Sequence, residues 1–476
     1  MQVTEALGER KEARELAYPS KDMMAAIAVT RFGLGARPGE LSAVQTDPMG
    51  WLKSQIVPAG ADPIPNGGVR TPERLSSLAA YRVERREAKA DGQPKSDPVV
   101  SAAMMLRDSV AEDFVARARL GATTPAGFRE RWALFWANHF TASATKLVTA
   151  VLAGPYENEA IRPRVFGRFE DLLIATSSHP AMLTYLDQAQ SIGPDSPIAS
   201  RAQRGGRTAG LNENLAREIM ELHTVGVDGG YTQADVTEFA KAMTGWSVGG
   251  PRDPDRIGQF VFRAPAHEPG FRTIMGKRYD QAGQDQAEAV MRDLAANPAT
   301  ARHVCGKLAR HFVADEPPQA LVDRLVASWT ASRGDLSTVA AALVAAPEAW
   351  DPTPAKFKTP YEFLVSSWRA IGGQPVSAEY LTPIMNQLGQ KAFSAPSPKG
   401  WPDDAATWCA PDAVIKRMTW AENFAAVVAE DRDTNRIAAE ALGARLSPQV
   451  AKAVARAESR PEALALLLMS PEFQRR

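Results

Sequence analysis

The sequence predicts a mainly α protein, a large multi-helix fold with at most a small β-hairpin. Apolar residues recur at intervals of three and four along most segments, the spacing that gives a helix one apolar face. Capping residues and terminating glycines follow one another along the chain, as they do where one helix succeeds another. The 476 residues are 45% hydrophobic and 23% charged, a composition typical of globular chains that bury a sizeable core.

The N-terminal segment divides into a charged extension and a first helix. Residues 1–20 are predicted to be the extension, and Ser20 can cap a helix that starts with the apolar stretch 23–29. Residues 21–476 are predicted to form a single large helical domain, or two lobes over 21–260 and 276–476. The apolar stretch is shorter than a secretory core and lacks a cleavage motif. We therefore expect a cytoplasmic location for the sequence as it stands, with a periplasmic or exported location as the alternative.

Three helices are predicted to carry most of the distinctive residues. Thr124 and Pro125 have the types that favour a helix cap and a first helical position. Asn212 can cap the second helix, and Thr232 with Asp235 forms a capping box for the third. The predicted ranges are 124–140, 212–222 and 232–244.

Strand signals are confined to one short region. Residues 259–263 alternate polar and apolar side chains, and residues 271–275 are a possible partner strand. Ala-rich helical patterns return over 280–350 and again over 361–473. The sequence thus predicts one small hairpin within a helical protein.

Several function classes lack support in the sequence. Lys plus Arg and Asp plus Glu each number 55, so the field of a general nucleic-acid binder is missing. Cys305 and Cys409 are the two cysteines, which excludes a disulfide framework. The longest uncharged stretch, 172–186, is too short and polar for a membrane span. No phosphate loop, dinucleotide, nucleophile-elbow or HExxH motif is present, so no nucleotide or flavin is indicated.

His139 lies on an aromatic stripe of its predicted helix. Spacings of three, four and seven from Trp132 place Phe135, Trp136 and His139 on the same face, so the imidazole is expected to be buried. A buried imidazole needs a polar partner. A backbone carbonyl is the favoured partner for the residue taken alone, and a metal or a substrate is the other.

The helix over 212–223 carries an unusual density of polar side chains. Glu213, Arg217 and Glu221 form an i, i+4 line typical of an ion-pair ladder. Glu218 and Glu221 lie one turn apart, so two carboxylates can converge on a cation or hold one proton between them. His223 lies about 200° from Glu221 around an ideal helix, at about 100° per residue, so both reach one metal only if the helix unwinds at its end.

The remaining histidines are weaker candidates. His267 and Glu268 lie in a predicted loop, where a solvated histidine is favoured over a ligand or an acid/base pair. His303 and His311 lie eight residues apart with Lys307 between them, a spacing that does not converge well. We expect neither of these two to belong to the site.

A loop rich in proline and tryptophan occupies residues 396–408. It contains Trp401 and Trp408 among several prolines. Such a loop can line a groove that binds a sugar or a partner. A loop that pins a long connection to the core is the favoured alternative.

Several segments together carry a family resemblance. They are NENLAREIMELHTVGVDGGYTQADV and TGW within 210–246, FWANHF at 135–140, HPAMLTYLD at 179–187, RFGLGA at 31–36, FKTPYE at 357–362 and the GQ, P, P, GWP pattern over 389–402. From about residue 24 to 473 the chain resembles an uncharacterised bacterial family catalogued as domain of unknown function eighteen hundred. The resemblance implies no established activity. It implies relatives that often look exported, and gene neighbours similar to sulfatases and alkaline phosphatases, which suggests envelope or polysaccharide metabolism.

The leading hypothesis is a metal-dependent enzyme with a Glu/His site between helices. The predicted catalytic residues are Glu218, Glu221, His223 and Arg217, and the predicted metal ligands are His139, Glu218, Glu221 and His267. These side chains are expected to surround one pocket, with Arg217 as an anion clamp or an orienting partner. A mixed oxygen and nitrogen set suits iron, manganese or zinc. The alternative is a non-enzymatic helical scaffold or assembly partner of a sulfatase-like protein.

Overall fold

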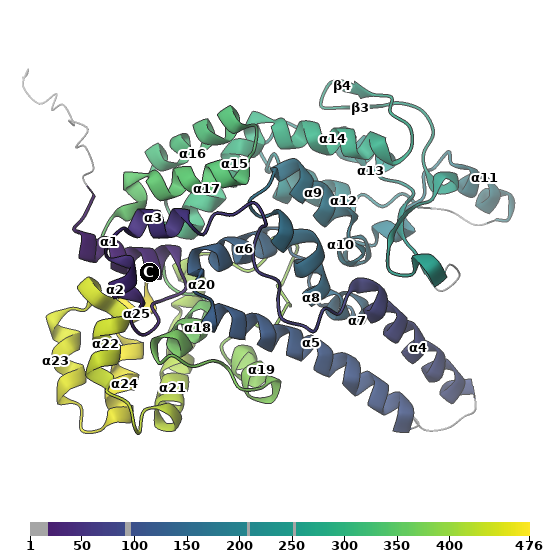
Figure 1. The fold of residues 1–476 in the computed structure, drawn as a ribbon. Coiled ribbons are helices and arrows are strands. Elements are labelled where there is room, and N and C mark those ends of the chain that lie inside the picture. The colour runs from purple at the N-terminus through teal and green to yellow at the C-terminus, as the bar shows by residue number, and fades with distance from the viewer. Residues whose placement is uncertain (1–17, 91–96, 207–209, 251–253) are drawn as a thin grey trace, which may run out of the picture.

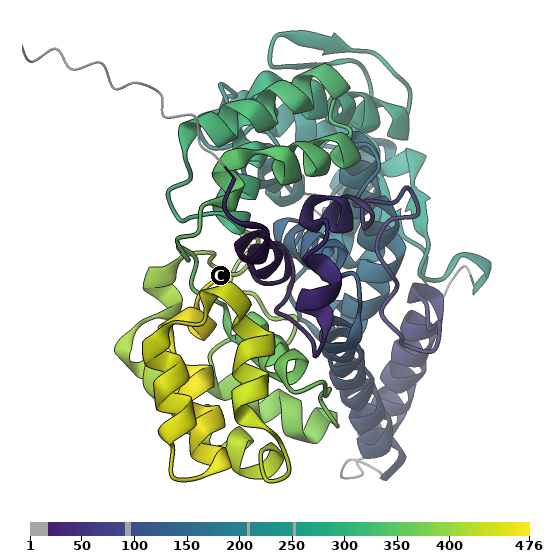
Figure 2. The same ribbon diagram turned by 60° about the vertical axis from the view of Figure 1, so that its left-hand side comes forward.

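Helices make up most of the protein, and the predicted mainly α class is confirmed. A computed structural model describes residues 18–90, 97–206, 210–250 and 254–476. The charged extension predicted over 1–20 therefore lies almost entirely outside the described residues. Figures 1 and 2 show the helices in several packed groups.

The first half of the chain contributes short helices and one long pair. Its elements are α1 (Lys21–Ile27), the π-helix η1 (Ala28–Phe32), α2 (Glu40–Val44), α3 (Pro48–Lys53), α4 (Thr71–Ala90), α5 (Asp97–Thr123), α6 (Gly127–His139), α7 (Leu147–Val151), α8 (Ala153–Tyr156), the π-helix η2 (Glu157–Ile161), η3 (Arg162–Arg164), α9 (Phe169–Ser178), α10 (Pro180–Tyr185), η4 (Gln188–Gln190) and α11 (Pro197–Arg204). Helices α4 and α5 pair along their length and project from the body (Figure 1).

The middle of the chain holds the strands and a group of four long helices. Its elements are α12 (Asn214–Glu218), the π-helix η5 (Ile219–His223), α13 (Gln233–Ala242), β1 (Trp246–Val248), η6 (Pro254–Arg256), β2 (Phe260–Phe262), η7 (Ala264–Ala266), β3 (Arg272–Ile274), β4 (Lys277–Tyr279), α14 (Gln284–Ala296), α15 (Pro298–Phe312), α16 (Gln319–Ser332), α17 (Leu336–Ala345) and η8 (Pro347–Trp350).

The last third forms a second helical group, separate from α14–α17 in both views (Figures 1 and 2). Its elements are α18 (Pro360–Ala370), α19 (Ala378–Gln387), α20 (Ala405–Trp408), α21 (Pro411–Val428), α22 (Thr434–Leu442), η9 (Gly443–Arg445), α23 (Pro448–Arg456), α24 (Arg460–Met469) and α25 (Pro471–Gln474). None of the described helices combines the length and the apolar composition that crossing a bilayer requires.

The buried apolar residues form two clusters. One extends over residues 24–350, and the other joins residues 361–473 to Leu34 and to the second half of α5. The clusters divide between residues 350 and 361, so segments on both sides of 260–276 share the first of them. The division into lobes over 21–260 and 276–476 stays a prediction.

Local capping signals place some helix starts correctly and others not. The Ser20 hydroxyl accepts from Met23 N, and Thr232 and Asp235 form the predicted capping box of α13. At Thr124 the prediction was wrong, because α5 runs on to Thr123 and α6 begins only at Gly127. The Thr124 hydroxyl instead accepts from Ala126 N at 3.0 Å and shapes the turn between the two helices.

The two predicted strand segments exist, but they do not pair with each other. Strand β2 pairs antiparallel with β1, and β3 pairs with β4. Strand β1 begins at Trp246, just beyond the predicted helix end at residue 244, where no strand was predicted. The choice of partner depends on which segment tertiary packing brings alongside, and propensity does not encode this.

Candidate functional site

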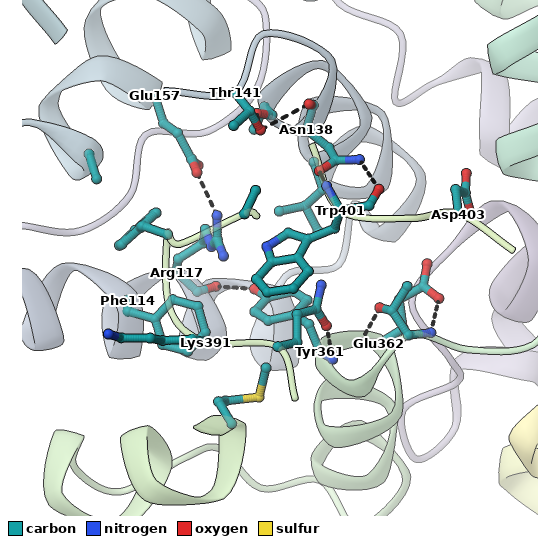
Figure 3. A pocket seen from close by; sticks show the side chains of 18 of the residues that line it. Phe114, Arg117, Asn138, Thr141, Glu157, Tyr361, Glu362, Lys391, Trp401 and Asp403 are labelled. Atoms are coloured by element: carbon teal, nitrogen blue, oxygen red, sulfur yellow. Dashed lines mark hydrogen bonds and ion pairs between the residues drawn. The ribbon is translucent and has the colours of Figure 1, made fainter. Parts of the chain in front are cut away.

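A cavity of about 130 Å³ lies where α5, α6 and α18 meet the loop over 389–403 (Figure 3). Apolar side chains form much of its wall, with charged groups at separate points. The basic and acidic side chains among its lining residues are Arg117, Arg131, Glu157, His311, Glu362, Lys391 and Asp403. A mainly apolar hollow with a few converging polar groups is the usual form of a small-molecule site.

His311 and Asp403 form a hydrogen-bonded pair at one end of this cavity. Nδ1 of His311 donates to Oδ2 of Asp403 at 2.8 Å. Nε2 of the same ring is buried and has no hydrogen-bond partner among the described residues. With the proton of the neutral ring on Nδ1, the Nε2 lone pair is left unused. An imidazole oriented by a carboxylate with its second nitrogen unused is a typical acid/base arrangement.

Burial and the neighbouring groups set the protonation states of His311 and Asp403. Burial lowers the pKa of His311, and the charge of Asp403 opposes that shift only in part. Burial on its own raises the pKa of Asp403, but the hydrogen bond from His311 and the charges of Lys356 and Arg476 outweigh it and hold that pKa below its usual range. At neutral pH the imidazole is therefore uncharged and the carboxylate ionised.

Lys356 fixes the position of Asp403. Its Nζ lies 3.2 Å from Oδ1 of Asp403 and donates to the backbone oxygen of the same residue at 2.6 Å. The Lys356 side chain is 1% exposed and also pairs with Asp315, whose other oxygen accepts from Ala405 N at 2.8 Å. These contacts tie the end of the loop to the body of the protein.

Glu362 lies beside this pair, at the start of α18, between two arginines. Arg131 from α6 donates to Oε1, and Nε of Arg476 donates to Oε2 at 3.2 Å. Thr359 and Glu362 also form a capping box, which orients the carboxylate. Burial on its own raises the pKa of Glu362, and Arg131 and Arg476 outweigh it, so the pKa lies well below its usual range. This carboxylate is a permanent anion that positions the two cations.

Arg117 marks the other end of the cavity. Its guanidinium carbon lies 5.0, 5.0 and 4.6 Å from the ring centroids of Phe114, Tyr361 and Phe393. It pairs with Glu157, the first residue of the π-helix η2. Aromatic faces attract a guanidinium, so the three rings hold this cation in place.

The loop over 389–403 crosses the cavity and is attached to α6. Nδ2 of Asn138 donates to the backbone oxygen of Trp401 at 3.0 Å, and Oδ1 accepts from the backbone N of Trp401 at 2.7 Å. Figure 3 shows the Trp401 indole between Arg117 on one side and Glu362 with Asp403 on the other. The loop thus both pins a long connection to the core and lines a cavity, the two alternatives that the sequence left open.

The structure brings two of the predicted site residues together, away from this cavity. Nε2 of His139 donates to the backbone oxygen of His223 at 3.1 Å, and the two ring centroids lie 5.8 Å apart. Lys307 donates to Nδ1 of His139 at 2.9 Å. Both nitrogens of His139 are thus used, with a backbone carbonyl as one partner, as favoured for this residue taken alone. Burial lowers the pKa of His139 and of His223, and Lys307 adds to both shifts.

The predicted carboxylate pair occupies the partly exposed side of α12 and η5. Glu218 has a raised pKa, first because of burial and then because of Glu221. The predicted ladder forms only in its first half, since Arg217 pairs with Glu213 at 3.0 Å and also donates to Gln233. The helix changes to a π-helix at Ile219, which alters the angular spacing of its last turn.

His267, the fourth predicted metal ligand, bonds to a backbone group and not to the other predicted ligands. Its Nδ1 donates to the backbone oxygen of Thr244 at 2.9 Å. Within the described ranges, no three His, Cys, Asp or Glu side chains are grouped so that they could hold a metal ion. The set of His139, Glu218, Glu221 and His267 therefore does not converge as expected, and none of the four lines the cavity. The metal itself stays a prediction.

The acid/base pair at the cavity was not predicted from the sequence, and the reason is physical. His303, Lys307 and His311 do lie along one line of α15, but each has a partner from a different element. Asp403, the partner of His311, is 92 residues away along the chain, so no local spacing indicates the pair. One signal was available: the segments 135–140, 357–362 and 389–402, all singled out by motif, converge on this cavity.

The comparisons with known proteins agree with the family resemblance, and they do not indicate an activity. A family described as a protein of unknown function, DUF1800, matches residues 27–475. No curated protein matches the chain, and no solved structure matches it. Because the match covers nearly the whole sequence, the chain belongs to the DUF1800 family.

Proposed function

We propose that the protein is an enzyme that uses His311 as a general acid and base on a small molecule bound in the cavity beside Trp401. The observation that carries the proposal is the buried, unpartnered Nε2 of His311 opposite an Nδ1 held by Asp403. Leaving a buried polar nitrogen unpaired costs about 1–3 kcal/mol. A ligand group that bonds to Nε2 removes this cost.

The chemistry available is proton transfer. The neutral imidazole can accept a proton at Nε2 while Asp403 stabilises the imidazolium that forms. Asp403 is in turn held by Lys356, so the ring keeps its orientation during the transfer. Arg131 borders the same end of the cavity. Its positive charge would stabilise negative charge that develops on an oxygen of the bound substrate during the reaction.

Turnover of a substrate panel tests the proposal. Wild-type protein is assayed with small esters, lactones, glycosides and carbon acids, and each active class is repeated with His311→Gln and Asp403→Asn. We expect turnover of at least one class, and a loss of about 10²–10⁴-fold in kcat/KM for His311→Gln, the range of a general acid or base. His303→Gln is the matched control on the same helix, and its activity should equal that of the wild type. Equal turnover by His311→Gln and wild type sinks the proposal.

The same panel separates an enzyme from the non-enzymatic alternative. A scaffold that assembles with a sulfatase-like protein would turn over none of the four classes, and His311→Gln would change only the melting temperature. Co-purification with a sulfatase-like protein would then support that alternative. Cell fractionation of the native protein tests the expected cytoplasmic location against a periplasmic one.

The divalent metal of the sequence hypothesis needs a separate measurement. Elemental analysis of protein purified without added metal gives the iron, manganese and zinc content per chain. A stoichiometric metal that is lost in both His139→Ala and Glu218→Ala would establish that hypothesis. A metal content unchanged by these substitutions would refute the predicted ligand set.

A further inference from the structure

We infer that the cavity takes a small ring-bearing carboxylate, with its ring against Trp401 and its carboxylate at Arg117 and Lys391. The inference rests on the proposed function and names its substrate class. The cavity end at His311 and Asp403 holds the acid/base pair, and the end at Arg117 holds the anion. Figure 3 shows Trp401 between these two ends.

Arg117 is a preformed anion site with unused donors. Among the described residues, Nη1 is the one guanidinium nitrogen of Arg117 that forms a hydrogen bond, to Glu157. Its Nε is buried without a partner. The rings of Phe114, Tyr361 and Phe393 surround the guanidinium and hold it in one orientation. A guanidinium held in this way can bind a carboxylate with little loss of side-chain entropy.

The charge balance at this end favours an anion. Glu157, which would repel one, is shared between Arg117 and Arg162. Arg162 also binds Glu130 through two hydrogen bonds of 2.8 Å. Lys391 lines the same cavity, is exposed, and forms no ion pair with any described residue. The lysine is thus the surplus charge that a carboxylate would neutralise.

Trp401 supplies a surface for a ring. Its backbone is held by both polar groups of Asn138, and the described residues offer no acceptor for its indole N–H. Aromatic side chains bind flat rings through offset or edge contacts. The volume of about 130 Å³ limits the ligand, since a cavity of about 150 Å³ holds one benzene molecule. The cavity thus takes no more than one six-membered ring, and the carboxylate would lie at its edge, where Lys391 is exposed.

Two kinds of ligand share this chemistry, an aromatic acid and a sugar acid, and binding measurements distinguish them. Benzoate is compared with benzyl alcohol, and glucuronate with glucose, by calorimetry with the full-length protein. We expect one carboxylate to bind at least ten-fold more tightly than its uncharged counterpart. Benzoate alone would assign an aromatic acid, and glucuronate alone a sugar acid.

Two lysines of the same loop provide the variant and its control. Lys391→Ala removes a charge at the cavity, and Lys399→Ala removes an exposed charge that does not line it. We expect Lys391→Ala to weaken carboxylate binding about three- to ten-fold and Lys399→Ala to leave it unchanged. Since Lys391 is exposed and unpaired, its loss should not unfold the protein.

Three results would overturn the inference. The first is equal binding of the charged and the uncharged probes. The second is an equal effect of the two lysine variants on binding. The third is no binding of any probe at 10 mM, a concentration set at about the weakest dissociation constant of interest. If the turnover panel finds a substrate without a carboxylate whose conversion requires His311, the inference fails while the proposed function stands.

Discussion

Asn138 holds the main chain of Trp401 through two hydrogen bonds, one from Nδ2 to the backbone oxygen and one to Oδ1 from the backbone nitrogen. These bonds join the motif at 135–140 to the loop over 389–402, more than 250 residues later in the chain. The indole that borders the cavity therefore owes its position to a side chain on α6. This relationship makes Asn138 a positioning residue of the candidate site.

Asn138→Leu should lower the free energy of unfolding by about 2–4 kcal/mol, because two backbone groups of Trp401 lose their partners. It should also weaken the binding of whichever carboxylate the cavity takes. Asn158 is a matched control, since it holds the backbone N and O of Ile64 in the same way, at 2.7 and 3.1 Å, at another place. Asn158→Leu should show a similar loss in urea denaturation with unchanged binding. Unchanged binding in both variants would contradict the positioning role.

Gly400→Ala tests how closely the loop approaches α6. Gly400 has φ +89°, and a Cβ there would lie 2.5 Å from the backbone oxygen of Asn138. Gly389→Ala is the control, because Gly389 has φ +86° with no atom within 4 Å of a Cβ. Both variants pay about 1 kcal/mol or more for the left-handed backbone. We expect Gly400→Ala to lose at least about 1 kcal/mol more in denaturant unfolding, and equal losses would argue against the contact.

Glu362→Gln should destabilise the protein by about 3–5 kcal/mol, because it leaves Arg131 and Arg476 buried without their shared anion. Folding lowers the pKa of Glu362 below its ordinary value of about 4.5, so its contribution to stability is complete above about pH 5 and is lost as the pH falls through the folded value. The stability difference between wild type and variant should therefore shrink below about pH 4.5. Glu213→Gln, at a partly exposed pair with Arg217, should cost under about 1 kcal/mol. A difference that stays constant down to pH 3, well below about 4.5, would contradict this account.

Lys307 should make stability rise with pH in the alkaline range. Burial lowers its pKa from 10.5 to about 8, so between these values the unfolded chain binds one more proton than the folded chain. Each unit of pH in that window then adds at most about 1.4 kcal/mol to the free energy of unfolding. Lys307→Met should remove this rise between pH 8 and 10, measured by denaturant unfolding, whereas Lys416→Met at a partly exposed position should keep it. Equal slopes in wild type and Lys307→Met would refute the assignment.

The fold class was predicted from local helix signals, such as capping residues, that are also present in the tertiary structure. Ser20 and Thr232 begin their helices as predicted, because a hydroxyl that caps an amide three residues later needs nothing from the rest of the chain. Thr124 failed as a helix start although its residue type was right. Helix α5 continued to the preceding residue, and tertiary packing decided where the next helix began.

Much less of the candidate site could be predicted from the sequence. The aromatic stripe of α6 correctly indicated a buried His139, but this imidazole is used by Lys307 and by a backbone carbonyl. Asn138, the residue before it, is the one that reaches the cavity. The spacing of His303 and His311 argued correctly against convergence on each other and could not show that His311 meets Asp403.

By itself the sequence determined that the chain is mainly helical, where the helices after Ser20 and Thr232 begin, that His139 is buried, and to which family the chain belongs. These properties depend on residues within a few turns of one another or on a direct match along the chain. Only the tertiary structure decided that His311, Asp403, Glu362, Asn138 and Trp401 border one cavity. The reason is physical: these side chains come from α6, α15, α18 and the loop over 389–403, and the packing of these elements, not any local spacing, sets the distances between them.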